Sequence, residues 1–217
     1  MQSSSGGVVQ FDTPQDPIVS VIVVTTGKAP DLLGCLKALA DNTHEVPFEI
    51  IVVENGLAPS ASEALAFGAS GVVVINSGVN RGFAGGCNLA ARAARGRYLV
   101  LLNDDAETQP GWLAPLLEDI EEPGVGAVGG RVLHSDGTLQ EAGSVVWMDG
   151  SSSGVGRDLP GDETSLRFRR RVEYCSALCL LVRRETWEEL GGLDEGYFPA
   201  YYEDVDFCLR IAERGET

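Results

Sequence analysis

The chain has 217 residues, of which 44% are apolar and 22% are charged. This composition is typical of a folded protein and excludes a disordered chain. The longest wholly apolar runs are about six residues, whereas a transmembrane helix needs ~20, so we expect no membrane span. With 16 basic and 32 acidic side chains the net charge is −16. A surface this acidic repels phosphodiester backbones, which argues against nucleic-acid binding.

The first residues and the cysteines bear on the compartment. Residues 1–17 lack the basic start and the apolar core of a signal peptide, and we interpret them as a disordered lead-in. The five cysteines are odd in number and show no zinc-finger spacing, which favours reduced thiols in a cytoplasmic protein. Residues 18–217 are long enough for one large domain.

The first half of this domain alternates apolar, β-branched runs with amphipathic segments. Runs that are apolar on both faces are typical of buried parallel strands. The expected strands are Ile18–Val24, Phe48–Glu54, Gly71–Asn76 and Arg97–Asn103. The expected helices are Pro30–Asn42, a short helix from the capping box Ser60-x-x-Glu63 to Gly68, and Ala84–Arg95.

This alternation predicts an α/β fold with right-handed crossovers and a mostly parallel, Rossmann-like sheet covered by helices on both faces. Ligands of such sheets bind beyond the carboxyl ends of the strands. The residues expected there are Thr25-Thr26, Glu54-Asn55, Asn76 onward and Asn103-Asp104-Asp105.

The second half is less regular, and we expect it to form a smaller mixed region. Its expected helices are Pro110–Glu122, Glu185–Leu190 and Glu203–Arg214. Its expected strands are Val125–Val132, Gly143–Met148 and Ala177–Val182. Ser151–Arg171 is rich in Gly, Ser and charge, which indicates a long surface loop.

Asn103-Asp104-Asp105 is the sharpest local signal. Two carboxylates at the end of a buried strand are costly to desolvate unless a positive charge compensates them. Mg²⁺ or Mn²⁺ would do so, because these ions prefer oxygen ligands and commonly combine one or two carboxylates with substrate phosphates. A simple turn after the strand explains the same residues, and both interpretations stay open.

A second acidic cluster, Glu203-Asp204-Val205-Asp206, opens the last expected helix. Acids in a first turn are favoured by the helix dipole whatever the function, and Asp206 can pair with Arg210 one turn later. We also expect Phe198, Tyr201 and Tyr202 to shelter one of these carboxylates from water, which would raise its pKa toward that of a general base.

Two further segments are weaker signals. The Gly-rich stretch Asn80–Asn88 precedes a helix, where glycines allow close approach and the helix N-terminus attracts an anion such as a diphosphate. The basic run Arg167–Arg171 fits either a solvated loop or an anion-binding lid. Neither His44 nor His134 has a partner in the sequence that suggests metal binding or a triad.

Taken in order, five motifs resemble the inverting glycosyltransferases of family 2, with the greatest likeness to rhamnosyltransferase-like and polysaccharide-assembly members. The resemblance covers about residues 18–214 and rests on VSVIVVTT, EIIVVEN, NRGFAGGCN, YLVLLNDDAE and LLVRRETWEELGGLDEGYFPAYYEDVDFCLR. It implies a GT-A fold, with a nucleotide-binding half at 18–105 and an acceptor-binding half at 106–217.

The resemblance also implies roles for individual residues. The expected donor-binding residues are Thr25, Thr26, Glu54, Asn80, Gly82, Gly85, Asn103 and Asp104. Asp105, with Asn103, would hold a divalent metal ion, Mg²⁺ or Mn²⁺. Asp204 would be the general base, with Glu203 beside it shaping the acceptor site.

The sequence departs from the family pattern at several places. Val24-Thr25-Thr26-Gly27 replaces the usual Pro-Thr-Tyr-Asn at the base contacts, and Ser176-Ala177 replaces a Ser-Gly turn near the donor sugar. Two further departures concern the metal site. Asn103 stands where the family's D-x-D motif has an Asp, while Asp105 is kept. Family members usually continue beyond the base-bearing helix to a His that completes the metal site, and no His follows His134 here. We therefore expect either a C-terminally truncated form or an incomplete metal site.

The expected reaction is transfer of a sugar from a UDP- or dTDP-linked donor to a hydroxyl of a glycan or lipid-linked glycan. We expect the protein in the cytoplasm, where it could also contact the inner face of the membrane. Two alternatives remain. One is a non-catalytic domain that binds a nucleotide sugar or a partner protein. The other is a sugar nucleotidyltransferase, which should carry a Gly-rich triphosphate loop that TTGKAPD does not provide. The sequence leaves the sugar, the acceptor and the oligomeric state open.

Overall fold

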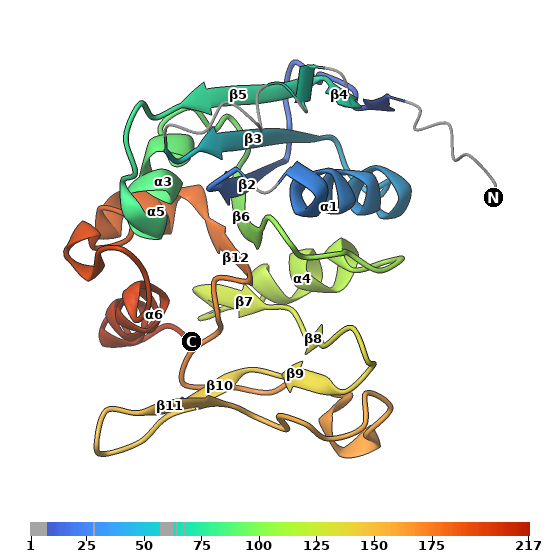
Figure 1. Ribbon diagram of the computed structural model, residues 1–217. Helices are drawn as coiled ribbons and strands as arrows, with labels where there is room; N and C mark the ends of the chain where they lie inside the picture. Colours follow the sequence, from blue (N-terminus) through green and yellow to red (C-terminus); the bar gives the residue numbers. More distant parts are fainter. Residues whose placement is uncertain (1–7, 28, 57–62, 64, 67) are drawn as a thin grey trace.

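A computed structural model describes residues 8–27, 29–56, 63, 65–66 and 68–217 (Figure 1). Most of the helix expected at 60–68, including its capping residue Ser60, lies outside these residues. The centre of the protein is a six-stranded sheet in the order β5-β3-β2-β6-β12-β7. Its strands are β2 (Val19–Thr25), β3 (Phe48–Glu54), β5 (Val72–Asn76), β6 (Tyr98–Asn103), β7 (Ala127–Gly129) and β12 (Cys179–Arg183).

The four strands of the first half pair in parallel, as expected, and β12 runs antiparallel to both β6 and β7. The chain first builds outward from β2 through β3 to β5 and then returns to place β6 on the other side of β2. The topology therefore switches direction between β2 and β6, which is where ligands of open α/β sheets bind.

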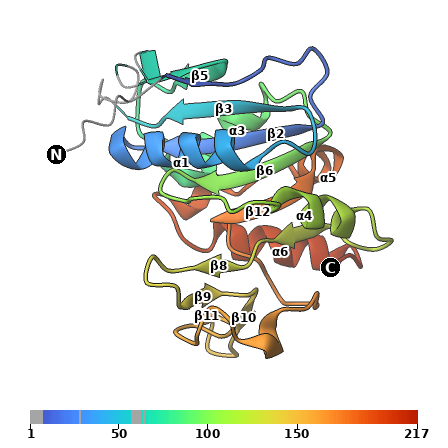
Figure 2. The same ribbon diagram turned by 90° about the vertical axis from the view of Figure 1, so that its right-hand side faces the viewer.

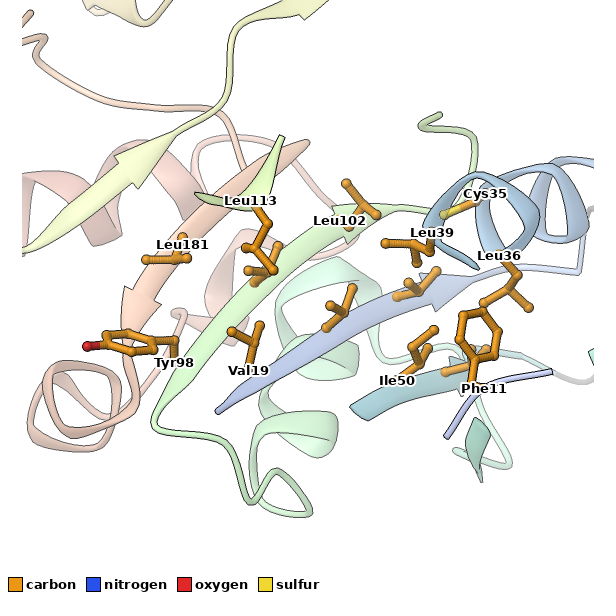
Figure 3. Packing of buried hydrophobic residues seen from close by; sticks show 14 of the residues in the cluster. Phe11, Val19, Cys35, Leu36, Leu39, Ile50, Tyr98, Leu102, Leu113 and Leu181 are labelled. Carbon is orange, nitrogen blue, oxygen red and sulfur yellow. The ribbon is translucent and has the colours of Figure 1, made fainter. Parts of the chain in front are cut away.

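Helices cover both faces of the sheet, because alternate residues of each strand point to opposite sides. One face packs against α1 (Ala29–Asn42) and α4 (Leu113–Ile120), through residues such as Val19 and Ile50 (Figure 3). The other face packs against α3 (Gly82–Ala91), α5 (Arg184–Leu190) and α6 (Glu203–Glu213). Figure 2 shows α1 in front of the strands and α3 behind them.

Residues 132–171 form a smaller region below the main sheet in Figure 1. It contains two antiparallel pairs, β8 (Val132–Leu133) with β9 (Leu139–Glu141) and β10 (Ser144–Val146) with β11 (Ser152–Gly154). β9 and β11 were not predicted, and β11 and a 3₁₀ turn at Thr164–Leu166 lie within the expected surface loop. A second 3₁₀ turn spans Glu195–Tyr197.

Two other expectations need correction. The lead-in was expected to be disordered through residue 17, but β1 (Val9–Gln10) pairs in parallel with β4 (Ala69–Ser70), and Phe11 is buried in the core. An apolar side chain can be buried against the sheet even when its neighbours in sequence are polar. The strand at β5 was expected to be buried, but it is an edge strand whose Val73 and Val74 are more than 40% exposed.

A helix was expected from Pro110 to Glu122. α4 is shorter at both ends, because it begins at Leu113 and ends at Ile120. Pro115 is then its third residue and lies in the first turn, where a missing N–H breaks no intrahelical hydrogen bond. Among the described residues, no helix is both long and apolar enough to cross a membrane.

Candidate active site

The expected site residues of the nucleotide half gather at one edge of the sheet. The register aligns Thr25 of β2 with Glu54 of β3, and Glu54 with Asn76 of β5. Asn103 of β6 pairs with Val24, one residue before Thr25. Asn76 Nδ2 donates to Glu54 Oε2 at 3.3 Å. The carboxyl ends of four strands therefore present one continuous polar row.

Thr25 and Thr26 lie differently in this row. Thr25 is buried, and its hydroxyl accepts a hydrogen bond from the Gly27 N–H at 3.2 Å. That hydrogen bond holds the turn after β2. Thr26 is exposed, so its side chain is the more accessible of the two at this edge.

Asn55, the residue after β3, holds the start of the Gly-rich helix α3. Its Oδ1 accepts from the Arg81 N–H at 2.8 Å, and its Nδ2 donates to the Gly82 carbonyl at 2.8 Å. Asn80 Oδ1 accepts from the Gly82 N–H at 2.8 Å and lies 3.3 Å from Asn55 Nδ2. From the sequence, Asn55 was placed at the carboxyl end of a strand but was not included among the expected donor-binding residues. Its amide, which can donate and accept at once, was the available signal for this role.

The glycines of this stretch were expected to precede a helix that starts at Ala84, but they belong to α3 itself, which begins at Gly82. They make room for the protein itself. A Cβ on Gly82, where φ is +72°, would lie 2.8 Å from the Pro199 carbonyl, and the neighbouring Phe83 N–H donates to that same carbonyl at 2.8 Å. A Cβ on Gly86 would lie 2.7 Å from Val24 Cγ1. A Cβ on Gly85 would meet the Arg81 side chain at 2.9 Å. Close packing of the chain therefore accounts for these glycines, whether or not a diphosphate binds beside them.

Asn103-Asp104-Asp105 forms a tight turn in which the Ala106 N–H donates to the Asn103 carbonyl at 3.2 Å. Asp105 is exposed and Asp104 is half-buried. The negative field of this turn reaches α1, because burial and then the carboxylates of Asp104 and Asp105 raise the pKa of the Cys35 thiol to about 12. Residues 103–105 thus form the simple turn that was one of the two interpretations. Their carboxylates are also chemically suited to bind a cation.

The oxygen-rich donor set of this turn fits a hard divalent ion. Within the described ranges, no group of three or more His, Cys, Asp or Glu side chains is arranged to hold a metal ion. The turn can therefore supply one or two carboxylates, and phosphate oxygens and water would have to supply the remaining ligands.

The second acidic cluster forms the first turn of α6. Asp204 is half-buried; its Oδ2 accepts from the Ala177 N–H at 3.0 Å and its Oδ1 from the Val205 N–H at 2.8 Å. Asp206 pairs with Arg210 at 2.7 Å, as expected, and that pair belongs to the structure of the helix.

Glu203 is the sheltered carboxylate of this cluster. It is 5% exposed, and its Oε2 has no hydrogen-bond partner in the part of the chain that the structure describes. Burial, followed by the neighbouring charge of Asp204, raises its pKa. Phe198, Tyr201 and Tyr202 were expected to provide the shelter, but they are 60%, 82% and 40% exposed. The side chain instead lies near Cys87 of α3, whose thiol pKa is raised by burial and by the Glu203 charge.

The two acidic clusters are joined through residues 177 and 178, just before β12. The Asn103 N–H donates to the Leu178 carbonyl at 3.1 Å, and the N–H of the preceding residue, Ala177, donates to Asp204. Because β12 runs antiparallel to β6, its start lies at the carboxyl end of β6. The end of β6 and the start of α6 therefore meet at one edge of the sheet.

A cavity of about 870 Å³ lies apart from the expected site residues. It is lined by parts of β7 and α6 and by the segment from Phe168 to Cys175, and its lining includes none of the residues predicted for donor binding or catalysis.

The chain matches the sequence profile of glycosyl transferase family 2 over residues 20–191. It therefore belongs to glycosyltransferase family 2, which confirms the resemblance drawn from the five motifs. It is 34% identical to the O-antigen biosynthesis protein RfbC of Myxococcus xanthus, over 95% of this chain and 17% of that protein. The chain thus corresponds to a small part of that longer protein.

It is also 27% identical to the N-acetylglucosaminyl-diphospho-decaprenol L-rhamnosyltransferase of Mycobacterium tuberculosis, over 91% of this chain and 71% of that enzyme. Its fold is similar to that of the mannosyltransferase PcManGT of Pyrobaculum calidifontis, solved with GDP-Man and Mn²⁺, with a TM-score of 0.65. That likeness covers 94% of this chain and 55% of the other at 20% identity. The α/β, GT-A fold expected from the sequence is confirmed.

Proposed function

We propose that this chain transfers a sugar from a UDP- or dTDP-linked donor to a hydroxyl of a glycan or lipid-linked glycan, with inversion at the anomeric carbon. The observation that carries the proposal is the connection of the two acidic clusters through residues 177 and 178. Displacement at the anomeric carbon needs a proton acceptor on one face and stabilisation of the departing diphosphate on the other. One site that unites both clusters supports this pair of tasks.

In this proposal Asp204 takes the proton of the acceptor hydroxyl as the oxygen attacks. The Ala177 and Val205 amides hold its carboxylate in place. Glu203 shapes the acceptor side from its buried position. A single displacement inverts the anomeric centre and leaves the diphosphate as the departing group, so no covalent sugar–enzyme intermediate is required.

The donor side consists of the polar row at Thr25, Thr26 and Glu54 and of Asn80, Gly82 and Gly85 at the start of α3, with Asn103 and Asp104 completing it. Asp105, with Asn103, would hold Mg²⁺ or Mn²⁺. When bound, such an ion would supply Lewis-acid stabilisation of the diphosphate's negative charge. The half of the chain at 18–105 would then bind the donor and the half at 106–217 the acceptor.

Free thiols at all five cysteines support a reducing, cytoplasmic location, and acceptor chemistry like that named for the mycobacterial relative would bring the protein to the membrane surface. The non-catalytic alternative keeps donor binding without turnover. The nucleotidyltransferase alternative would instead release pyrophosphate from a nucleoside triphosphate and a sugar phosphate.

The test is a transfer assay that uses dTDP-rhamnose, UDP-glucose and UDP-N-acetylglucosamine as donors and an N-acetylglucosaminyl-diphospho-polyprenol as acceptor. We expect Asp204→Asn to lower transfer by at least ~10²-fold, the usual scale for loss of a general base, while nucleotide binding persists. Asp206→Asn, a matched change on the same helix, should keep transfer. Equal transfer by the wild type and Asp204→Asn would remove Asp204 as the base.

A further inference from the structure

We propose that Glu141 is a positioning residue for this reaction: its carboxylate lies beside Asp204, at the same turn, and its ionisation tunes proton uptake by Asp204. The inference rests on the proposed function, because it assigns Asp204 as the base. Glu141 was not among the residues expected from the sequence.

The geometry comes from two consecutive residues of the turn before β12. The N–H of Ala177 donates to Asp204 Oδ2 at 3.0 Å, and the Glu141 carboxylate lies close enough to Asp204 and to the backbone of the preceding residue, Ser176, for both to affect its pKa. Both carboxylates, one from β9 and one from α6, therefore border the same turn before β12. Ser144 Oγ donates to Glu141 Oε2 at 3.3 Å.

The chain just after Glu141 is anchored to the same segment at Ser144, the first residue of β10. The Ser144 N–H donates to the Tyr174 carbonyl at 3.0 Å, and these two residues form an isolated antiparallel bridge. Glu141 itself is 7% exposed. Its place beside Asp204 is therefore fixed by the fold of the smaller region.

The groups that face Glu141 come from three segments. Asp204 of α6 repels its charge and Arg157, after β11, attracts it. Cys175 and Cys179, before and at the start of β12, are half-buried, and the pKa values of their thiols are raised by desolvation and in part by Glu141. Burial first, and then the Asp204 charge, raises the pKa of Glu141 to about 7, against the opposing effect of Ser144 and Ser176.

This placement has a consequence for the reaction. Asp204 loses its negative charge as it takes the acceptor's proton. An ionised carboxylate beside it favours that neutralisation, so it stabilises the transition state more than the ground state. Transfer should therefore rise as Glu141 ionises, near neutral pH.

It also has an opposite consequence for stability. Because the folded-state pKa of Glu141 lies above the usual value for a glutamate, stability is greatest below that usual pKa and falls as the pH rises through about 7. Glu141→Gln keeps the shape and the hydrogen-bond acceptor but removes the charge. At pH 8 this variant should melt at a higher temperature than the wild type and yet transfer sugar several-fold more slowly.

The experiment measures transfer and melting temperature from pH 5 to 9 for the wild type, Glu141→Gln, Ser144→Ala and the control Glu118→Gln, an exposed glutamate of α4. We expect a step in transfer near pH 7 that Glu141→Gln lacks. Ser144→Ala removes a donor that lowers the pKa of Glu141, so its step should move to higher pH. Glu118→Gln should match the wild type.

If the wild type transfers sugar and Glu141→Gln shows the same pH step and the same rate, the role of Glu141 is contradicted, while the proposed function is not. A Glu141→Gln chain whose rate and melting temperature fall together at every pH would make Glu141 merely structural. A wild type that transfers no sugar would contradict the proposed function, and the role of Glu141 with it.

Discussion

At the scale of single residues, neighbouring carboxylates of this protein differ through their surroundings. Asp204 accepts two backbone N–H groups, whereas Glu203, next to it in sequence, is buried with an oxygen that has no hydrogen-bond partner in the described part of the chain. A buried polar atom without a partner lowers stability unless something else compensates for it. We therefore expect Glu203, at the proposed acceptor site, to lower the stability of the folded protein.

Because the pKa of Glu203 is raised, its effect on the stability of the fold should depend on pH in a direction that can be measured. Stability contributed by such a group is present below the unfolded-state pKa and is lost as the pH rises through the folded-state pKa. Glu203→Gln should therefore raise the melting temperature at pH 8 and change it less at pH 4, while slowing transfer. Thermal melts at both pH values measure this. A variant that melts lower than the wild type at pH 8 would show that the charge of Glu203 is stabilising.

At the scale of elements, the buried parallel strands could be predicted closely because their apolar runs are local signals. Phe48–Glu54 has the same bounds in the sequence prediction and in β3. The short strands β9 and β11 carry polar residues and pair only within small hairpins, so no local pattern marks them. The Glu141–Asp204 neighbourhood escaped prediction for a related reason, since it joins three segments that are distant in sequence.

Glycine at position 86 tests how tightly α3 packs on β2. A Cβ there would lie 2.7 Å from Val24 Cγ1, so Gly86→Ala should destabilise the protein by ~1–3 kcal/mol, the usual cost of overpacking a core. Gly34→Ala in α1 is the matched control, because its Cβ would meet only Glu107 Oε1 at 3.8 Å.

Chemical denaturation of both variants gives the comparison. Gly34→Ala should be neutral or stabilising by up to ~1 kcal/mol, since alanine favours a helix over glycine. If Gly86→Ala were as stable as Gly34→Ala, α3 would not be held against β2 as closely as the structure has it.

At the scale of the whole molecule, the central claim is that the acidic turn after β6 and the first turn of α6 serve one site. The sequence could predict that both clusters are chemically suited to it, because acids at strand and helix ends are visible in the residues. Their connection through Leu178 and Ala177 could not be predicted, because it depends on where an antiparallel strand starts. With a net charge of −16, an anionic diphosphate would need positive compensation to bind at this edge.

The most direct measurement is the melting temperature of the chain with UDP or dTDP, in Mn²⁺, in Mg²⁺ and in EDTA. Ligand linkage predicts a stabilisation of ~2.7 kcal/mol at a hundredfold excess over Kd, and we expect it only with the divalent ion. Asp105→Ala should lose the metal-dependent shift, and Asp204→Asn should keep it. Equal stabilisation in EDTA, or an unchanged metal-dependent shift in Asp105→Ala, would contradict a cation held by the turn after β6.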